Sequence, residues 1–221
     1  MERQELSIFT EILLQYMAAE NKNHWENVYE QKGPSEVSWT QESPQTSLDF
    51  INGFGVDKSA SIIDIGGGDS KLVDYLLDAG YENITVLDIS SKALDKAKAR
   101  LGEKAAKVKW IVSDITEFDP PTSYDIWHDR ATFHFLTTPS QIEKYLHIAG
   151  ENVKGFLSIG TFSENGPEKC SGLFIKKYSE DELSSALNKY FDKLECRKED
   201  HITPFGTSQN FLFCSFQRRR N

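Results

Sequence analysis

The sequence predicts an α/β domain with a doubly wound, mostly parallel sheet. From residue 61 onward, short apolar runs rich in β-branched residues alternate with longer segments of helical periodicity. Strands that are separated by helices imply crossover connections, which give parallel strands with helices on both faces of the sheet. A glycine-rich turn, "DIGGGDS", follows the first apolar run, and two strand-like runs without a helix between them close the chain.

Seven strand-like runs account for the predicted sheet. They lie at 61–65, 83–89, 108–114, 124–129, 153–162, 190–200 and 210–217, and helical patterns lie at 69–80, 90–102, 139–150 and 179–190. The last two runs are joined by "HITPFGTSQ", which carries no helical pattern. We therefore expect those two strands to pair antiparallel.

Two helical patterns precede this core. Residues 5–19 and 23–32 place apolar side chains three and four positions apart, the spacing of an amphipathic helix. A stretch rich in Gly, Pro and Ser then reads as a loop. At 221 residues and 38% hydrophobic, the chain is long enough for one sizeable core. We expect a single domain over 1–221, with an N-terminal helical lid or extension at 1–55 and a Rossmann-like core at 56–221.

Charge and cysteine content exclude several classes of protein. The formal net charge of −9 gives no positive field for phosphates, which argues against a nucleic-acid partner. No apolar run approaches a membrane-spanning length, so we expect a soluble, cytoplasmic protein without a membrane partner. The three cysteines, Cys170, Cys196 and Cys214, show no CxxC spacing. That pattern argues against a disulfide framework or a zinc site and favours a reducing compartment, with Cys196 and Cys214 as small buried hydrophobes.

The glycine turn is the first candidate for ligand binding. Gly66, Gly67 and Gly68 carry no side chains where a strand turns sharply into a helix, so backbone amides can approach a ligand closely. Nicotinamide-binding turns need a third small residue for helix packing, and Lys71 stands at that position. Asp64, just before the turn, can accept from loop amides or from a ligand's amino group.

Acidic residues also end the next two predicted strands. Asp88 lies 20 positions after Gly68, a spacing that suits a carboxylate accepting both hydroxyls of a ribose, and Ile89 beside it belongs to the same expected site. Asp114 closes the third strand and can accept from an adenine amino group while Ile115 packs on the ring. Each acid alone is explained as a helix cap or turn former. Three acids at successive strand ends instead favour a nucleotide-like ligand.

These motifs resemble those of the class I, seven-strand S-adenosylmethionine-dependent methyltransferases. The resemblance covers roughly residues 24 to 217 and depends on "DIGGGDS", "VLDIS", "SDITEF" and the terminal strand pair, which looks like the reversed seventh strand of that class. Within the class, "HWENVYEQKGPSEVSWTQE", "GYENITVLDIS" and "WHDRATFHFL" look most like the group containing lysine methyltransferases that act on translation elongation factor. The group has an acidic, glycine-containing segment after the fourth strand, where this chain has Ala131 for the glycine and His134 for a later acid.

The resemblance implies S-adenosylmethionine as the cofactor and methyl transfer by direct displacement. The acceptor would be an N, O or S nucleophile on a protein side chain, such as a lysine, or on a small molecule. Two alternatives stay open, namely a non-catalytic module that binds the cofactor and, more distantly, an NAD-dependent oxidoreductase. The sequence does not define the acceptor or the oligomeric state.

Two further groups of residues are expected near the methyl group. Trp25, Tyr29 and Trp39 precede the first strand of the core and can place aromatic faces or packing surfaces over a sulfonium cation. The segment after the fourth strand supplies the expected catalytic residues, which are His128, Asp129 and His134. A neutral histidine can take a proton from an acceptor, and Asp129 can orient a cationic substrate. The alternative is a structural ion pair between Asp129 and Arg130. We expect no metal, because no ligand pair has a recognised spacing, although Cys170 lies in a loop over the same edge.

Overall fold

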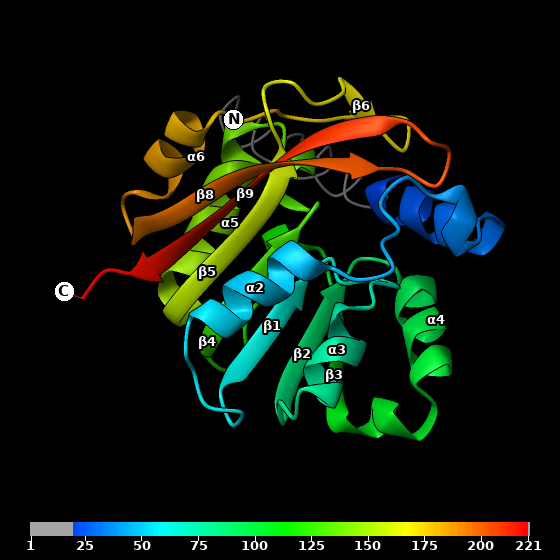
Figure 1. The fold of residues 1–221 in the computed structure, drawn as a ribbon, viewed down its shortest axis with the longest axis horizontal. Helices are drawn as coiled ribbons and strands as arrows, with labels where there is room; N and C mark the ends of the chain where they lie inside the picture. The colour runs from blue at the N-terminus through cyan, green and yellow to red at the C-terminus, as the bar shows by residue number, and fades with distance from the viewer. Residues whose placement is uncertain (1–19, 221) are drawn as a thin grey trace, which may run out of the picture.

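The computed structural model describes residues 20–220, and the expected helix at 5–19 lies outside them. The described residues form a seven-stranded sheet in the order β3-β2-β1-β4-β5-β9-β8 (Figure 1). All neighbouring strands are parallel except for the two pairs that include β9. The predicted fold, with its antiparallel last strand, is therefore confirmed. The strands are β1 (Ser61–Ile65), β2 (Asn83–Asp88), β3 (Val108–Val112), β4 (Tyr124–Arg130), β5 (Val153–Phe162), β8 (Phe191–Ile202) and β9 (Ser208–Arg218).

Helices cover both faces of the sheet. The elements are a helix at residues 20–31, α2 (Gln45–Gly53), α3 (Leu72–Asp78), α4 (Ser91–Leu101), α5 (Pro139–Asn152) and α6 (Glu180–Leu187). Short 3-10 helices are η1 (Pro34–Glu36), η2 (Gly102–Lys107), η3 (Ile115–Glu117) and η4 (Phe133–Phe135). Side chains of α2, α3 and α4 pack in one core cluster, and those of α5 and α6 pack in another.

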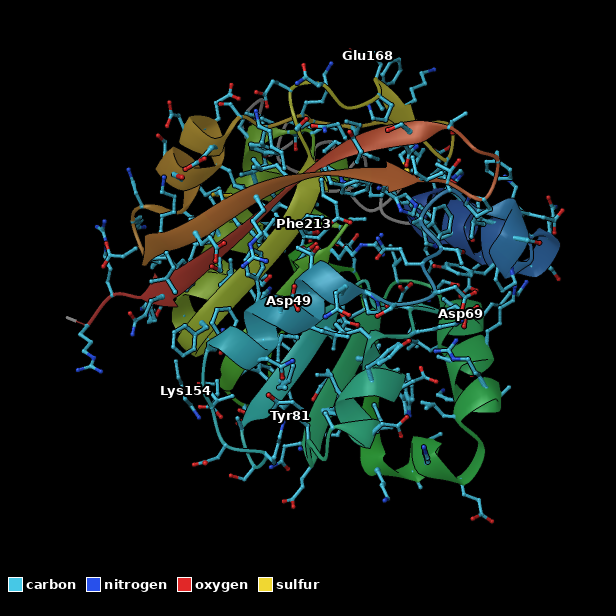
Figure 2. The ribbon with its side chains drawn as sticks, in the orientation of Figure 1. Asp49, Asp69, Tyr81, Lys154, Glu168 and Phe213 are labelled. Atoms are coloured by element: carbon cyan, nitrogen blue, oxygen red, sulfur yellow. A yellow bond between two sulfur atoms is a disulfide. The ribbon has the colours of Figure 1, made fainter. Side chains whose placement is uncertain are left out.

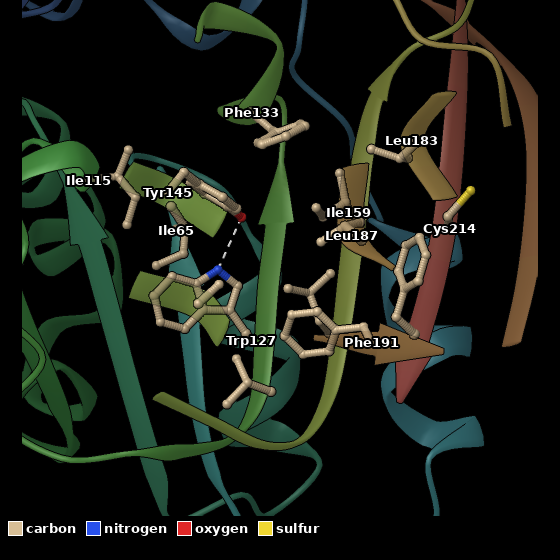
Figure 3. Close-up of a cluster of buried hydrophobic side chains, with 14 of the residues drawn as sticks. Ile65, Ile115, Trp127, Phe133, Tyr145, Ile159, Leu183, Leu187, Phe191 and Cys214 are labelled. Atoms are coloured by element: carbon tan, nitrogen blue, oxygen red, sulfur yellow. Dashed lines mark hydrogen bonds between the residues drawn. The ribbon is translucent and has the colours of Figure 1, made fainter. Parts of the chain in front are cut away.

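The second cluster is built around a polar contact between two buried aromatic side chains. Trp127 of β4 donates from its indole Nε1 to the Tyr145 hydroxyl of α5 at 3.1 Å (Figure 3). Leu183, Leu187 and Phe191 close the same cluster from α6 and β8. The hydrogen bond satisfies two polar groups inside an apolar core, where an unpaired group costs about 1–3 kcal/mol.

Local sequence signals explain where the helices begin. The Ser90 hydroxyl accepts from the Ala93 amide and starts α4, whose buried positions then recur at helical spacing. Thr138 and Gln141 form a capping box around Pro139 at the start of α5.

Two elements were not predicted from the sequence. Helix α2 lies within the expected extension, yet it packs on the sheet, with the Phe54 ring just after it stacked 4.5 Å from the Phe156 ring of β5. The sheet-bound part of the chain thus begins before residue 56. A short hairpin of β6 (Lys169–Cys170) and β7 (Leu173–Phe174) follows β5 in the predicted polar loop.

The prediction that no disulfide forms is wrong. Cys196 and Cys214 are joined by a disulfide, whereas Cys170 is a buried free thiol. The two bonded residues are direct partners in the antiparallel register of β8 and β9. That register depends on the turn between the strands, so the number and spacing of cysteines could not reveal it. No helix among residues 20–220 is long and apolar enough to cross a membrane.

Candidate functional site

A cavity of about 320 Å³ lies where β1, β2 and β4 end, and the expected residues meet there. In Figure 1 the arrowheads of β1 and β2 point toward this end of the sheet, where the helix at 20–31 is drawn in blue. Carboxyl ends of parallel strands are the usual ligand-binding edge of such sheets. Eleven of the expected residues line the cavity, namely Trp25, Tyr29, Trp39, Asp64, Gly66, Gly67, Asp88, Ile89, Asp114, Ile115 and His128.

The glycine turn shapes the floor of this cavity. Gly66 has a φ of +63°, and a Cβ there would collide with the Thr132 side chain. A Cβ on Gly67 would lie 2.6 Å from Oδ2 of Asp64. Gly68 lies beside the cavity rather than on its lining, and its Cβ position is 2.7 Å from the Tyr29 hydroxyl. The glycines therefore leave room for the neighbouring polar side chains as well as for a ligand. Asp69, labelled in Figure 2, follows this turn.

Asp64, His128 and Ser47 form a buried chain of hydrogen bonds. The Asp64 Oδ1 atom is 2.7 Å from Nδ1 of His128, and Nε2 of the same ring is 2.8 Å from the Ser47 hydroxyl. A carboxylate only accepts, so Nδ1 carries a proton toward Asp64, and Nε2 forms a hydrogen bond with the serine hydroxyl. Both ring nitrogens of His128 are therefore engaged within the protein.

Asp88 lies at the end of β2 and is almost fully buried. Burial raises the pKa of its carboxyl group to about 7, and the nearby charges of Asp64 and Glu26 add to this rise. The Ser90 amide donates to Oδ1 at 2.8 Å and partly offsets the rise. Asp88 also lines the cavity, where hydroxyl donors would stabilise its charged form.

Asp114 and Ile115 line the third side of the cavity. Asp114 caps the 3-10 helix η3, because its Oδ1 accepts from the amide and the hydroxyl of Thr116, both at 2.8 Å. The capping role expected as an alternative is thus present, and it coexists with a place on the cavity wall. Ile115 is buried beside it.

Three aromatic side chains expected near the cofactor form one cluster over the cavity. The Trp25 ring lies 5.7 Å from the Trp39 ring and 5.1 Å from the Phe135 ring, and Tyr29 lies 6.2 Å from Trp39. Burial, followed by the charges of Asp88 and Asp69, raises the pKa of Tyr29 well above its usual value. Its hydroxyl is therefore neutral at physiological pH.

Glu26 fastens this aromatic cluster to the rest of the domain. Its carboxylate accepts from the backbone amides of Ser91 and Lys92 at 2.8 and 3.1 Å, and from the hydroxyls of Ser90 and Ser91 at 2.9 Å. Burial raises the pKa of Glu26, but these donors outweigh it and hold the pKa below its usual value. Sequence reasoning did not select Glu26, although an acid on the same helix as Trp25 and Tyr29 was available as a signal.

The structure does not bring Asp129 and His134 to the cavity, contrary to the expected catalytic roles. Asp129 is buried, and its Oδ1 accepts from the amides of Thr132 and Phe133 at 3.0 and 3.2 Å, which shapes the turn after β4. Burial raises the pKa of Asp129 to about 6. The His134 ring stacks 4.5 Å from the Phe162 ring, and burial, followed by the charge of Arg130, lowers its pKa to about 3.

Sequence reasoning assigned no site role to most of the other half of the cavity wall, although it expected Cys170 in a loop over this edge. Arg130 lines it and makes no ion pair with Asp129, and Cys170 lies there as a buried thiol. Within residues 20–220, no group of three metal-ligating side chains comes together. The remaining wall includes the apolar side chains of Phe135, Leu136, Phe162, Leu173, Phe174 and Phe211 and polar residues such as Thr132, Gln141 and Gln209.

Comparisons with known proteins agree with this geometry. Residues 62–154 match a family model described as a methyltransferase domain. A malonyl-[acyl-carrier protein] O-methyltransferase of Anoxybacillus flavithermus is 35% identical over 105 residues, which are 47% of this chain and 39% of that protein. An eEF1A lysine and N-terminal methyltransferase of Mus musculus is 23% identical over 120 residues, 54% of this chain and 17% of that protein. The chain thus spans well under half the length of these two relatives.

A solved structure shares the fold over nearly the whole chain. The Burkholderia thailandensis 1,6-didemethyltoxoflavin-N1-methyltransferase, which holds S-adenosylhomocysteine, superposes with a TM-score of 0.65 at 17% identity, covering 96% of this chain and 89% of that one. The residues present here fit such a ligand, because a side-chain-free turn and three carboxylates face one cavity. The family match over residues 62–154 and the seven-stranded fold therefore indicate a class I methyltransferase domain, with S-adenosylmethionine as its cofactor.

Proposed function

We propose that the protein transfers a methyl group from S-adenosylmethionine to an N, O or S nucleophile on a protein side chain or a small molecule. The proposal rests mainly on one observation: Asp64, Asp88 and Asp114 line the same cavity as the glycine turn. The printed names of the relatives include an O-methyltransferase and a lysine methyltransferase, which supports the reaction type for both kinds of acceptor.

Each strand-end residue has a proposed binding role. Asp88 accepts from the ribose hydroxyls, while Asp114 and Ile115 hold the adenine. Asp64, oriented by His128, accepts from the amino group of the methionine part. Trp25, Tyr29 and Trp39 cover the site and place aromatic faces near a cation.

The proposed reaction mainly requires that the acceptor is aligned with the methyl group and the sulfur. When bound, the cofactor supplies an activated methyl group on a sulfonium. The protein holds the acceptor in line with that group and excludes water, which accounts for much of the rate of such displacements. The apolar wall opposite the carboxylates and the aromatic cluster are suited to excluding water.

Calorimetry and a transfer assay test the proposal together. We expect the chain to bind S-adenosylmethionine and S-adenosylhomocysteine with micromolar affinity and to leave NAD unbound. Asp88→Ala removes a charged acceptor, so the affinity should fall by about 10- to 150-fold, as expected for about 1.5–3 kcal/mol. Methyl-labelled cofactor incubated with a cell extract should then label an acceptor fraction. Binding of NAD without binding of S-adenosylmethionine would overturn the proposal.

A further inference from the structure

Among the described residues that line the cavity, Arg130 is the one lysine or arginine. Arg130 ends β4 and lines the cavity wall, with its guanidinium carbon 5.8 Å from the centre of the Phe211 ring. Its Nη1 atom donates to the Trp39 carbonyl at 3.2 Å. Within residues 20–220, Arg130 has no carboxylate within ion-pair distance.

The other edge of this guanidinium has no partner. Nε and Nη2 are both closed off from solvent, so a ligand reaches them only when the side chains that cover them shift, and no described residue accepts from them. Burial lowers the pKa of Arg130 to about 10, so the group is still a cation at neutral pH. Nε and Nη2 carry parallel N–H groups, the geometry that binds the two oxygens of one carboxylate. The charges of Glu199 and Asp64 offset part of the cost of burying this cation, but its two unused donors gain a partner only when a ligand supplies one.

The surfaces around Arg130 are apolar. Phe162, Leu173 and Phe211 line the same part of the cavity, and Cys170 lies with them. Burial raises the pKa of the Cys170 thiol to about 11, so this sulfur stays protonated and uncharged. An occupant that suits this wall has an apolar body as well as an anionic group.

No described side chain on this wall is ready to take a proton from the acceptor. Both nitrogens of His128 are engaged by Asp64 and Ser47, and His134 lies outside the cavity. A lysine acceptor arrives as an ammonium that must lose a proton, and here it would also face the like charge of Arg130. A carboxylate arrives with free lone pairs at neutral pH and meets an opposite charge.

We propose that the acceptor is a small apolar carboxylic acid, which Arg130 holds through its carboxylate, and that the product is its methyl ester. This rests on the proposed function. A carboxylate has four lone-pair positions, so two remain for reaction when two accept from Arg130. One carboxylate oxygen forms the bond to the methyl carbon, the bond from that carbon to sulfur breaks, and sulfur keeps the electron pair. No proton moves, and the neutral ester loses its attraction to Arg130, which favours release.

The first test determines which kind of bond the transferred methyl group forms. The full chain is incubated with methyl-labelled S-adenosylmethionine and the small-molecule fraction of a cell extract, and the products are treated with alkali. Methyl esters release labelled methanol, whereas N-methyl groups do not. We expect alkali-labile counts that fall at least tenfold with Arg130→Gln and less with Arg130→Lys, while the affinity of each variant for S-adenosylhomocysteine stays within twofold of the parent. Alkali-stable label, or no label despite intact cofactor binding, overturns the proposal.

The second test compares matched ligands and needs no turnover. Octanoate should raise the melting temperature of the complex with S-adenosylhomocysteine, whereas octanamide, its neutral amide, should not. Arg130→Gln should remove this difference between the two ligands. The alternative is that Arg130 binds the cofactor's own carboxylate, so methylthioadenosine, which lacks that group, is the control. If Arg130→Gln weakens S-adenosylhomocysteine but spares methylthioadenosine, the proposal is overturned and the proposed function stands. If the parent binds no S-adenosylhomocysteine, both fail.

Discussion

Asp64 of β1 and His128 of β4 are direct partners in the parallel register, and their side chains meet with 2.7 Å between Oδ1 and Nδ1. Since Ser47 engages the other ring nitrogen, the histidine holds the carboxylate in place rather than facing an acceptor. The pair therefore connects two neighbouring strand ends at the point where the glycine turn begins.

Replacing His128 should weaken cofactor binding. In His128→Phe the Asp64 carboxylate loses its buried donor, so we expect the affinity for S-adenosylhomocysteine to fall about tenfold, as for a lost hydrogen bond to a charged group. His128→Asn keeps an N–H donor and should stay within a few-fold of the parent, as should Ser47→Ala. Calorimetry measures all three. If His128 instead accepts the acceptor's proton, turnover will collapse in both histidine variants with unchanged affinity.

Cofactor affinity should rise with pH because of Asp88. In the free protein its pKa of about 7 leaves the carboxyl largely protonated at pH 6, and ribose hydroxyls bind the charged form best. We expect roughly five- to tenfold tighter binding of S-adenosylhomocysteine at pH 8 than at pH 6, measured by calorimetry. Asp88→Asn should bind weakly with a flat profile. An equally steep profile in that variant would assign the titration to another group.

The raised pKa of Asp88 also makes the free energy of unfolding depend on pH. Asp88 retains its proton in the folded state up to about pH 7, whereas an unfolded aspartate loses it near pH 4. Its contribution to the free energy of unfolding therefore falls as the pH rises through this window.

The turn should tolerate no side chain at Gly67. An added Cβ would lie 2.6 Å from Oδ2 of Asp64 and 2.7 Å from Cγ1 of Val86, so Gly67→Ala must displace the carboxylate. We expect at least a tenfold loss of affinity for S-adenosylhomocysteine and a lower melting temperature. Gly53→Ala is the matched control, because a Cβ there meets nothing within 4 Å, at the end of α2. Equal effects of the two substitutions would refute the steric explanation.

The disulfide between Cys196 and Cys214 predicts how many cysteines can be alkylated with and without a reductant. Denatured, unreduced protein should react with an alkylating reagent at one thiol, that of Cys170, and reduced protein should react at three. The loop between Cys196 and Cys214 spans 18 positions, so the double serine variant should lose roughly 3 kcal/mol of unfolding free energy in the chain-entropy account. Mass spectrometry counts the adducts. Three adducts without reductant would exclude the bond.

His134 should be dispensable for transfer. Both ring nitrogens are buried without a partner, so His134→Phe should keep the stability at pH 7 or raise it by about 1–3 kcal/mol. The parent histidine stays neutral down to about pH 3 when folded but gains a proton near 6.5 when unfolded, so it costs stability as the pH falls between these values. The variant's advantage should widen in acid, measured by denaturant unfolding. Lost transfer with intact cofactor binding would restore a catalytic role.

Much of the sheet could be predicted because its signals are local. The run at 153–162 coincides with β5, and the acids at 88 and 114 come at or just after strand ends, since apolar runs stop where the chain leaves the buried sheet. The family resemblance and the cofactor class followed from the same short motifs.

The misses share a different cause, because they depend on contacts between distant residues. Whether His134 faces the cavity depends on how the chain turns from β4 into η4. In that turn Ala131 takes a φ of +72°, at the position where the resembled group has glycine. The free edge of Arg130 depends on which carboxylates fold near it, and the disulfide depends on strand register. Periodicity and motif spacing contain no such information.

The hydrogen bonds of Glu26 fix the helix at 20–31 to the start of α4. This carboxylate occupies the N-terminal end of α4, a position that favours anions, next to the proposed ribose site at Asp88. The helix at 20–31 is thus held beside the part of the cavity that is proposed to bind the nucleoside. A cofactor analogue with a phosphorylated ribose would therefore meet the negative charge of Glu26 at this position.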